Sequence, residues 1–389
     1  MGARRLKKTD DTAAALESAR VKLERLTKKV TATQAKLEKR TRKLRAVESK
    51  IAQLERRGAA RRSSTPRPAR GDKGLRRACL IYNPKAEKKG ESLEQVVAAL
   101  HAHGIAATVD VKTSGRGARA MAKVALKEGV TLVIVAGGDS TIEEVVPALV
   151  GSEAVLGIVP VGTMNNVARS LGIPLSIDAA CALLGAGSTR QIDVGHVHGE
   201  GGKPTEYFLE TAGLGLSAIA FSAGEAAQKG PIAGLPRALA KFFDHKPDAI
   251  QVELDDGPPV LASAQLVTVS NAPLMGLNFL IAPRAKMDDG LLDIAVYDGM
   301  TKTELIEYFV SLRHGQPPDD ERVRFYRSST VRIVAAVPEE VASDKNPLPE
   351  KNTLQIKVLP HAITAVVGSG PGLSVPVEAG QEAQHVAEA

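Results

Sequence analysis

The chain contains 389 residues, 43% of them hydrophobic, so it can bury a large core and form two globular domains with further segments. Its formal net charge is +7, and its two cysteines, Cys79 and Cys181, both lie in apolar runs. This cysteine content excludes a disulfide-rich scaffold and is typical of a reducing compartment. The sequence offers neither about 18 consecutive apolar residues nor an apolar secretion signal, so we expect a cytoplasmic protein without a membrane-spanning helix.

Residues 1–57 have the heptad pattern of a basic coiled-coil helix. Apolar residues recur every seven positions at Leu16, Leu23, Val30, Leu37, Leu44 and Ile51. A second series falls three residues later, at Ala19, Leu26, Val47 and Leu54. An isolated helix needs a partner for such an apolar stripe, so we expect a homodimer through this helix, with a helical hairpin as the alternative.

The basic charge is concentrated at the same end of the chain. Residues 1–70 carry 22 Lys and Arg against 7 Asp and Glu, whereas the remainder is mildly acidic. An anionic membrane surface attracts each such cation by about 1 kcal/mol. Nucleic acid would be attracted too, but this segment has no aromatic residue for base stacking. We therefore expect peripheral association with an anionic membrane and no nucleic-acid partner, with a solvated helix face as the alternative.

The next segments predict a linker and two domains. Residues 58–74 are rich in Gly, Ser and Pro, which is typical of a flexible linker. From 75 to 188, apolar segments such as TLVIVA alternate with helical patterns such as ESLEQVVAALHAHG, which predicts a doubly wound parallel sheet that binds ligands at the carboxyl ends of its strands. From 189 to 367, short strands separated by turns predict an antiparallel β-sandwich, and 368–389 have the composition of a disordered tail.

Two glycine turns follow consecutive apolar strands of the predicted sheet. Gly137, Gly138, Asp139, Ser140 and Thr141 follow TLVIVA, and the residues Gly162 to Asn166 follow AVLGIVPV. Glycine lets backbone amides approach a phosphate, hydroxyl groups donate hydrogen bonds, and an aspartate can take a proton or hold Mg²⁺. Together the turns predict one nucleotide site, whereas either turn alone could be an ordinary strand-to-helix turn.

Six segments in order resemble the diacylglycerol kinase catalytic superfamily, which includes bacterial lipid kinases and sphingosine kinases. They are IYNPKAEKKG from Ile81, VKTSGRGARAMA from Val111, the GGDST turn, GIVPVGTMNNVARSLGIP from Gly157, IDVGHV with YFLETAGLGLSA, and IAPRAKMDDGLLDIAVYDG from Ile281. A final stretch, VASDKNPLPEKNTLQIKVLPHAITAVV from Val341, follows them. The resemblance covers roughly residues 75–367. It implies a two-domain lipid-kinase fold with the active cleft between the domains, and ATP- and Mg²⁺-dependent phosphorylation of a diacylglycerol-like or sphingoid-like lipid.

The resemblance also implies which residues bind ATP and metal. The ATP-binding residues would be Asn83, Thr113, Gly137, Gly138, Asp139, Ser140, Thr141, Glu144, Gly162, Thr163 and Asn165. A Mg²⁺ site would use the Asp289 carboxylate with the backbone carbonyls of Lys286 and Leu291. The alternatives are a solvated carboxylate at a helix start for Glu144 and a plain Asp-Gly turn for Asp289.

The general base is less well defined by the sequence. Bacterial relatives carry an Asp-Gly-Glu triplet near the C-terminal end, and the matching residues here are Asp344, Lys345 and Asn346. An amide has no useful basicity, so Asn346 cannot replace a glutamate as base. The resemblance to sphingosine kinases would instead make Asp139 the base, so Asp139 and Asp344 are both candidates.

Two further departures keep a second function class open. Ser140 replaces the second glycine of the usual GGDGT turn, which would cost about 1 kcal/mol if that residue had positive φ. Glu143 stands where an Asn is common. The alternative function is therefore a catalytically degenerate homologue that acts as a membrane or lipid-binding scaffold. NAD kinases share a GGDGT turn, but their Asn-x-Gly-x-Leu-Gly-Phe turn is absent at the second glycine site.

Overall fold

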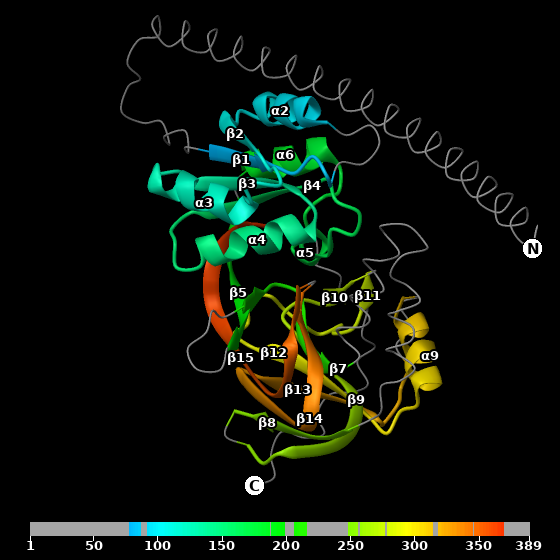
Figure 1. The fold of residues 1–389 in the computed structure, drawn as a ribbon. Helices are drawn as coiled ribbons and strands as arrows, with labels where there is room; N and C mark the ends of the chain where they lie inside the picture. The colour runs from blue at the N-terminus through cyan, green and yellow to red at the C-terminus, as the bar shows by residue number, and fades with distance from the viewer. Residues whose placement is uncertain are drawn as a thin grey trace, which may run out of the picture. The chain divides into compact units, whose positions relative to one another are not determined.

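A computed structural model describes residues 78–86, 92–186, 188–198, 206–215, 248–255, 257–276, 278–313, 318–344 and 346–368 (Figure 1). The chain divides into two compact units, and all of these residues belong to the second, Leu75–Ala389. The predicted coiled-coil helix and linker, and the predicted tail after Gly368, lie outside the described residues.

An α/β domain forms the first part of this unit. Its strands are β1 (Ala78–Tyr82), β2 (Ala107–Val111), β3 (Leu132–Gly137) and β4 (Val155–Pro160). They pair in parallel in the order β4-β3-β1-β2, as the alternating sequence pattern predicts. The helices are α2 (Leu93–Ala102), α3 (Ala118–Lys127), α4 (Asp139–Leu149), α5 (Asn166–Ser170) and α6 (Ile177–Ala186).

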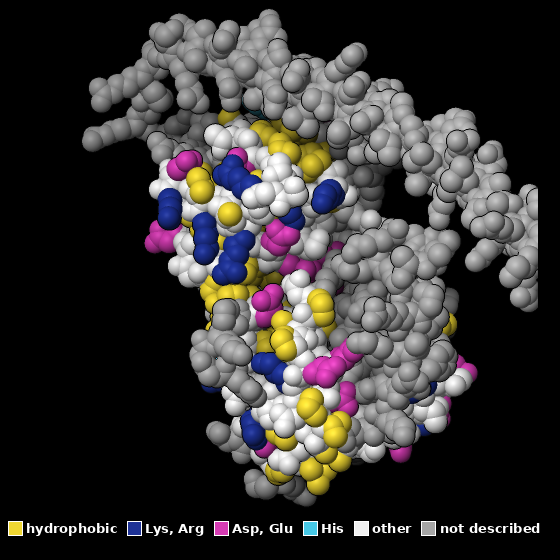
Figure 2. All heavy atoms as spheres, viewed as in Figure 1, with side chains coloured by type: hydrophobic (Ala, Val, Ile, Leu, Met, Phe, Trp, Pro, Cys, Tyr) yellow, Lys and Arg dark blue, Asp and Glu magenta, His cyan; other side chains and the backbone are white. Residues whose placement is uncertain are grey.

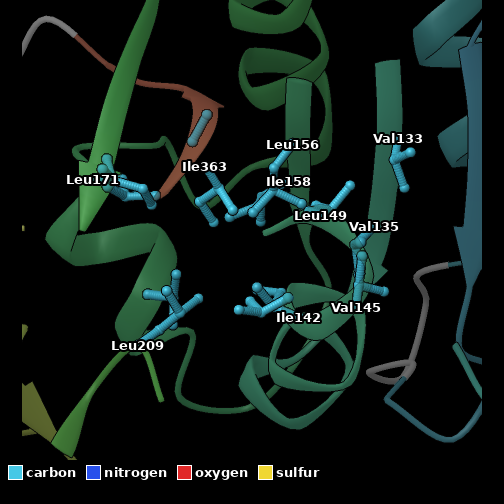
Figure 3. Packing of buried hydrophobic residues seen from close by; sticks show 14 of the residues in the cluster. Val133, Val135, Ile142, Val145, Leu149, Leu156, Ile158, Leu171, Leu209 and Ile363 are labelled. Carbon is cyan, nitrogen blue, oxygen red and sulfur yellow. The ribbon is translucent and has the colours of Figure 1, made fainter. Parts of the chain in front are cut away.

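Helices cover both faces of this parallel sheet, because successive strand residues point to opposite sides. Ile81 and Val133 pack on the face covered by α3 and α4, in the cluster drawn in Figure 3. Leu80 and Ile134 pack on the other face, with Val96 of α2 and residues of α6. The near-continuous apolar strands are explained by this burial on both sides.

The helix ends follow local sequence signals. Ser92 and Gln95 form a capping box at the start of α2. Gly104 and Gly129, which follow α2 and α3, have left-handed φ values of 79° and 76°. None of the helices in the described ranges has both the length and the apolar character needed to cross a membrane.

The second part of the unit is a β-sandwich-like domain of antiparallel strands. These are β5 (Thr189–His198), β6 (Glu206–Phe208), β7 (Thr211–Gly215), β8 (Asp248–Leu254), β9 (Val260–Ser270), β12 (Leu292–Asp298), β13 (Val323–Ser328), β14 (Thr330–Ser343) and β15 (Asn346–Val366). A small separate sheet contains β10 (Leu274–Met275) and β11 (Phe279–Leu280). The domain has its own buried core, to which Phe208, Val267 and Ile333 belong.

Strand β15 takes part in both domains. Its first half pairs with β14, whereas Thr364 and Ala365 pair in parallel with β4. The hydrogen bonds therefore join the strands of both domains into one 13-stranded sheet. Between the halves the register shifts, His361 has a left-handed φ of 51°, and its backbone N–H donates to Asp193 Oδ1 at 2.7 Å. Ile363 thus completes the core of the α/β domain (Figure 3).

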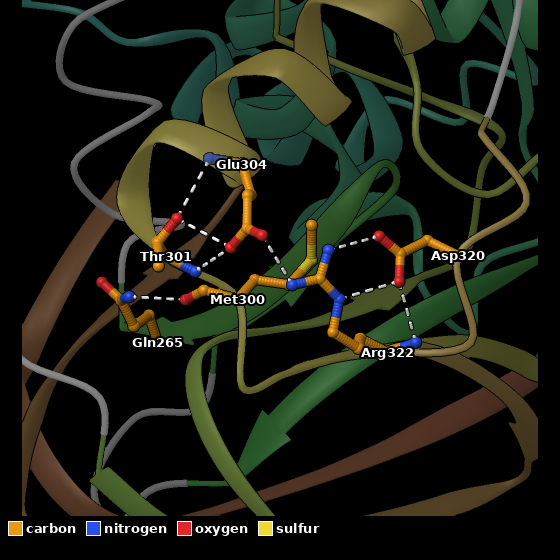
Figure 4. A network of polar contacts seen from close by, with 6 residues as sticks. All are labelled: Gln265, Met300, Thr301, Glu304, Asp320 and Arg322. Carbon is orange, nitrogen blue, oxygen red and sulfur yellow. Dashed lines mark hydrogen bonds and ion pairs between the residues drawn. The ribbon is translucent and has the colours of Figure 1, made fainter.

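Helix α9 (Lys302–Arg313) packs against the β-domain and is fixed at its start by polar contacts (Figure 4). Glu304 Oε2 accepts from the backbone N–H of Thr301 at 2.7 Å. Arg322 donates to Glu304 at 2.8 Å and to both carboxylate oxygens of Asp320. The Arg322 hydrogen bond is the main cause that lowers the pKa of Glu304 to about 2.

Candidate active site

The two predicted glycine turns lie in contact at the carboxyl edge of the parallel sheet. A Cβ on Gly162 would lie 2.3 Å from Gly138 Cα, and a Cβ on Gly138 would lie 3.2 Å from Gly162 Cα. Residue 162 has no room for a side chain, and a side chain on residue 138 would require a small shift of the second turn. The two backbones therefore form one continuous surface at the start of α4, as the order of the motifs predicts.

The first turn leaves the N-terminus of α4 open. Its N-cap is Gly138, which has no side chain to accept a hydrogen bond from the helix. Free backbone amides at a helix start bind anions such as phosphate. Asn83 lies beside this turn, where its Nδ2 donates to Thr141 Oγ1 at 2.7 Å. Ser140 is helical and does not have positive φ, so the serine causes no left-handed strain.

The second turn is held by its own asparagine. Asn165 has a left-handed φ of 54° and donates from Nδ2 to the Gly162 carbonyl at 2.8 Å. Its buried Oδ1 has no hydrogen-bond partner within the described ranges. Thr163 and Thr113 are exposed, so both hydroxyl groups face solvent at this edge. These features fit a nucleotide phosphate, because the edge combines open amides, hydroxyl donors and side-chain-free backbone.

Asp139 joins the two turns. It is buried in the first turn of α4, and its Oδ1 accepts from the backbone N–H of Val167 at 3.1 Å. Glu144, one turn further along α4, pairs with Lys112 and accepts from the backbone N–H of Ala118 at 3.1 Å. Glu144 therefore caps the start of α3 in this structure, and its predicted contact with ATP stays a prediction.

Asp344 holds the segment of the β-domain that lies at the candidate site. Its buried carboxylate accepts from the backbone amides of Leu209 at 2.9 Å, Glu210 at 2.9 Å and Thr211 at 3.0 Å. Its own φ is 48°, in the left-handed region. This residue therefore fixes the segment between β6 and β7, and the structure shows it in a positioning contact.

Glu210 and Asn166 connect the two domains. The sequence analysis placed Asn166 in the second glycine turn but did not single out Glu210. Asn166 Nδ2, at the end of the second glycine turn, donates to Glu210 Oε2 at 2.8 Å and to the Gly276 carbonyl at 3.0 Å. Both side chains are buried. The sequence does contain a sign of the role of Glu210, because this carboxylate lies inside the apolar run YFLETAGLGL. Such a run predicts burial, and a buried charge needs a specific partner.

Asn346, the third residue of the departing triplet, contacts a second carboxylate that the sequence analysis missed. Its Nδ2 donates to Glu206 Oε1 at 3.2 Å. Glu206 is half-buried on β6, and burial is the main cause that raises its pKa, while the positive charge of Arg119 and the hydrogen bond from Asn346 oppose the rise. A carboxylate therefore lies beside the amide of Asn346.

The turn with the predicted metal ligands contains cationic partners of its own. Asp289 pairs with Arg327, and the neighbouring Asp288 pairs with Arg190 at 3.0 Å. No group of three or more His, Cys, Asp or Glu side chains able to hold a metal occurs in the described part of the chain. As arranged, one carboxylate already bound by a guanidinium does not fit the oxygen-rich shell of Mg²⁺. The site at Asp289, Lys286 and Leu291 stays a prediction.

Family models match both domains of the chain. Residues 77–197 match the model described as diacylglycerol kinase catalytic domain. Residues 214–367 match the model described as YegS C-terminal NAD kinase β-sandwich-like domain. The two matches define a two-domain enzyme class in which an α/β catalytic domain precedes a β-sandwich-like domain.

Curated relatives and solved structures agree with these matches. A probable lipid kinase YegS-like protein of Pseudomonas aeruginosa is 30% identical over 73% of this chain and 92% of its own length. A diacylglycerol kinase of Bacillus subtilis is 28% identical over 67% of this chain and 86% of its own length. The chain belongs to the bacterial diacylglycerol kinase and YegS-like lipid kinase family. The fold is similar to a diacylglycerol kinase structure from Bacillus anthracis, with a TM-score of 0.58 and 23% identity over 77% of this chain and 99% of that one.

Proposed function

We propose that this protein is an ATP-dependent lipid kinase that transfers the γ-phosphate to the hydroxyl group of a diacylglycerol-like or sphingoid-like lipid. The observation that carries the proposal is the contact between Gly138 and Gly162, which creates an open backbone edge at the start of α4 that would bind phosphate. The curated names of relatives, diacylglycerol kinase and probable lipid kinase YegS-like, support the lipid as acceptor.

Phosphoryl transfer depends mainly on positioning and charge neutralisation. The amides at the start of α4 would bind phosphate oxygens, and the exposed hydroxyl groups of Thr113 and Thr163 would donate further hydrogen bonds. Mg²⁺ arriving with ATP supplies positive charge that offsets the charge on the transferring phosphate. Asp139 would hold the two glycine turns together through its hydrogen bond to Val167 during this step.

Transfer of labelled phosphate from ATP to a panel of neutral lipids tests this function. We expect product with a glycerol- or sphingoid-based lipid that carries a free hydroxyl group, and a rise in thermal midpoint when ATP is added. Asp139→Asn should reduce the rate, because the altered side chain weakens the link between the turns. Asp110→Asn is a matched control, since Asp110, which lies on β2, pairs with the exposed Arg116.

A different result would identify the alternative function. If no lipid is phosphorylated and ATP does not shift the thermal midpoint, the kinase proposal is wrong. The protein would then be a degenerate homologue that binds lipid or membrane as a scaffold.

We also propose that the heptad segment 1–57 dimerises the enzyme and binds it to anionic membranes. The proposal depends on the seven-residue apolar repeat and the basic charge of the sequence. Deletion of residues 1–57 should halve the mass in solution and reduce binding to vesicles that contain phosphatidylserine. Unchanged mass and unchanged vesicle binding would show that this segment has neither role.

A further inference from the structure

Four carboxylates at the junction of the two domains already have strong structural partners. Asp139 and Asp344 are buried and accept hydrogen bonds from backbone amides. Glu210 is buried and accepts from the side-chain amide of an asparagine. Glu144 pairs with a lysine and caps a helix. Protonation would weaken the positioning contact of each of these groups, because it removes the negative charge to which the donor is bound.

Glu206 combines half-burial with a neutral partner, a combination that none of these four carboxylates has, because three of them are buried and the half-buried Glu144 is paired with a lysine. Glu206 is half-buried, and its Oε1 accepts from the neutral amide of Asn346 at 3.2 Å. Its pKa is raised chiefly by burial, although Arg119 and Asn346 act in the opposite direction. A carboxylate with a raised pKa is a better proton acceptor near neutral pH than an ordinary one.

The surroundings place Glu206 at the candidate active site. Strand β6 pairs with β5 through Glu206 and Val197, and it packs against α4 and β14. Helix α4 begins at the first glycine turn, and the turn after β14 contains Asp344. Arg119 belongs to α3, over which Lys and Arg side chains gather in Figure 2. Strand β6 therefore lies between helix α4 and the turn after β14, and the hydrogen bond from Asn346 places the Glu206 carboxylate beside that turn.

We propose that Glu206 is the general base of the phosphoryl transfer, positioned by Asn346, an inference that rests on the proposed kinase function. The hydroxyl oxygen of the lipid forms a bond to the γ-phosphorus, and the bond from that phosphorus to the bridging oxygen breaks. ADP leaves with the electron pair of the broken bond. The hydroxyl proton passes to the oxygen of Glu206 that Asn346 does not hold, and then to water.

Asn346 has a defined part in this arrangement. As an amide it cannot take the proton, but its N–H donor holds one carboxylate oxygen and so orients the other. Asp344, at the start of the same turn, holds the segment that follows β6. The turn between β14 and β15 thus fixes β6 at both ends, and the carboxylate itself comes from β6.

An exchange of amide and carboxylate tests the assignment. Glu206→Gln removes the proton acceptor while keeping the size of the side chain. The double variant Glu206→Gln with Asn346→Glu returns a carboxylate to the same place, with an amide opposite. Glu253→Gln is a matched control, because Glu253 on β8 is a half-buried glutamate paired with Arg332 at 2.8 Å, outside the candidate site. All variants are assayed as full-length protein for kcat and KM with the best neutral lipid.

We expect kcat of Glu206→Gln to fall by about 100-fold, within the range of about 10²- to 10⁴-fold for general bases. KM for ATP and the thermal midpoint should stay close to those of the wild type, and the exchange variant should recover at least part of kcat. The Glu253→Gln control should match the wild type. A merely structural role for Glu206 would move the midpoint or KM and would not be rescued by the exchange.

The opposite results overturn the assignment. A Glu206→Gln enzyme as fast as the wild type shows that another group takes the proton. A slow Glu206→Gln enzyme that the folded exchange variant does not rescue assigns Glu206 a structural role. If Glu206→Gln does not fold, the folded exchange variant alone decides the question: activity supports the assignment, and lack of activity contradicts it. A wild type that phosphorylates no lipid overturns the kinase function itself and this inference with it.

Discussion

The backbones of Gly138 and Gly162 touch, and a methyl group on Gly162 would lie 2.3 Å from the Cα atom of Gly138. Real Cβ atoms do not approach other atoms so closely, so the two turns can meet in this way only if residue 162 is glycine, whereas a Cβ on Gly138, 3.2 Å from Gly162 Cα, would require a small shift. A Cβ on Gly162 would also lie 2.8 Å from Asn165 Oδ1. The contact between the two turns therefore depends chiefly on the absence of a side chain at residue 162.

Gly162→Ala should separate the turns and destabilise the protein. We expect the free energy of unfolding to fall by about 1–3 kcal/mol, as for overpacking in a core, and the ATP-induced thermal shift to disappear. Urea denaturation and thermal unfolding with ATP measure the two effects. Gly115→Ala is the control for stability, since a Cβ there meets no atom within 4 Å. Equal stability of the Gly162→Ala variant and the wild type would show that the turns can move apart at no cost.

The meeting of the glycine turns could be predicted from the sequence for a physical reason. Adjacent parallel strands end at the same edge, so turns that follow β3 and β4 must lie close together. Ser140 was harder to judge, because the cost of a Cβ depends on φ, which the motif does not fix. The structure places Ser140 inside α4, where a serine is tolerated.

The long-range contacts of the candidate site could not be predicted in the same way. Asp344 binds amides more than 130 positions earlier in the chain, and Asn346 reaches Glu206 at a separation of 140. No periodic pattern specifies such long-range pairs. The sequence analysis also did not predict that β15 returns to the sheet of the α/β domain. Only Thr364 and Ala365 pair with β4, and so short a segment has no pattern that assigns it to one domain. The sequence analysis assigned all of residues 189–367 to the β-domain, but the last residues of this range pair with the sheet of the α/β domain.

Asp344→Asn should lower stability and activity together. The amide that replaces one carboxylate oxygen cannot accept from the backbone N–H groups of Leu209, Glu210 and Thr211 as the carboxylate does. We expect a loss of about 1–3 kcal/mol in urea denaturation, and a lower kcat because Glu210 no longer reaches Asn166 correctly.

Asp255→Asn is the matched control for this substitution. Asp255 also has a left-handed φ, 46°, and accepts from the backbone N–H of Thr330 at 2.9 Å, but it is exposed. Its replacement should cost less stability and leave kcat unchanged. An Asp344→Asn protein with wild-type stability but no activity would show that Asp344 acts in the chemistry and not in positioning.

Because Arg327 neutralises the turn around Asp289, the thermal stability of the protein should not depend on divalent cations. The guanidinium pairs with Asp289 and lies 3.6 Å from Asp293, so wild-type thermal stability should not change when millimolar Mg²⁺ is added or chelated. Arg327→Gln should lower the midpoint, and Mg²⁺ should restore part of the loss, because the carboxylates of Asp289 and Asp293 then lose the guanidinium group they share. Arg324→Gln, on the same strand and paired with Asp298, is the control that Mg²⁺ should not rescue. A wild type stabilised by Mg²⁺ would instead support the metal site predicted from the sequence.

His196 should make the fold sensitive to mild acid. Its ring lies 4.5 Å from that of His198 and stacks on Tyr207 at 4.8 Å, and burial followed by the charge of His198 lowers its pKa below the ordinary value of 6.5. The folded state then binds a proton less readily than the unfolded state, so this stability is present above pH 6.5 and is lost as pH falls through the lowered pKa. His196→Phe keeps the stacking and should flatten the pH dependence of urea unfolding between about pH 7 and 5. His101→Phe, at an exposed site on α2, should leave that dependence unchanged, and an equal acid response of the His196→Phe variant and the wild type would contradict the assignment.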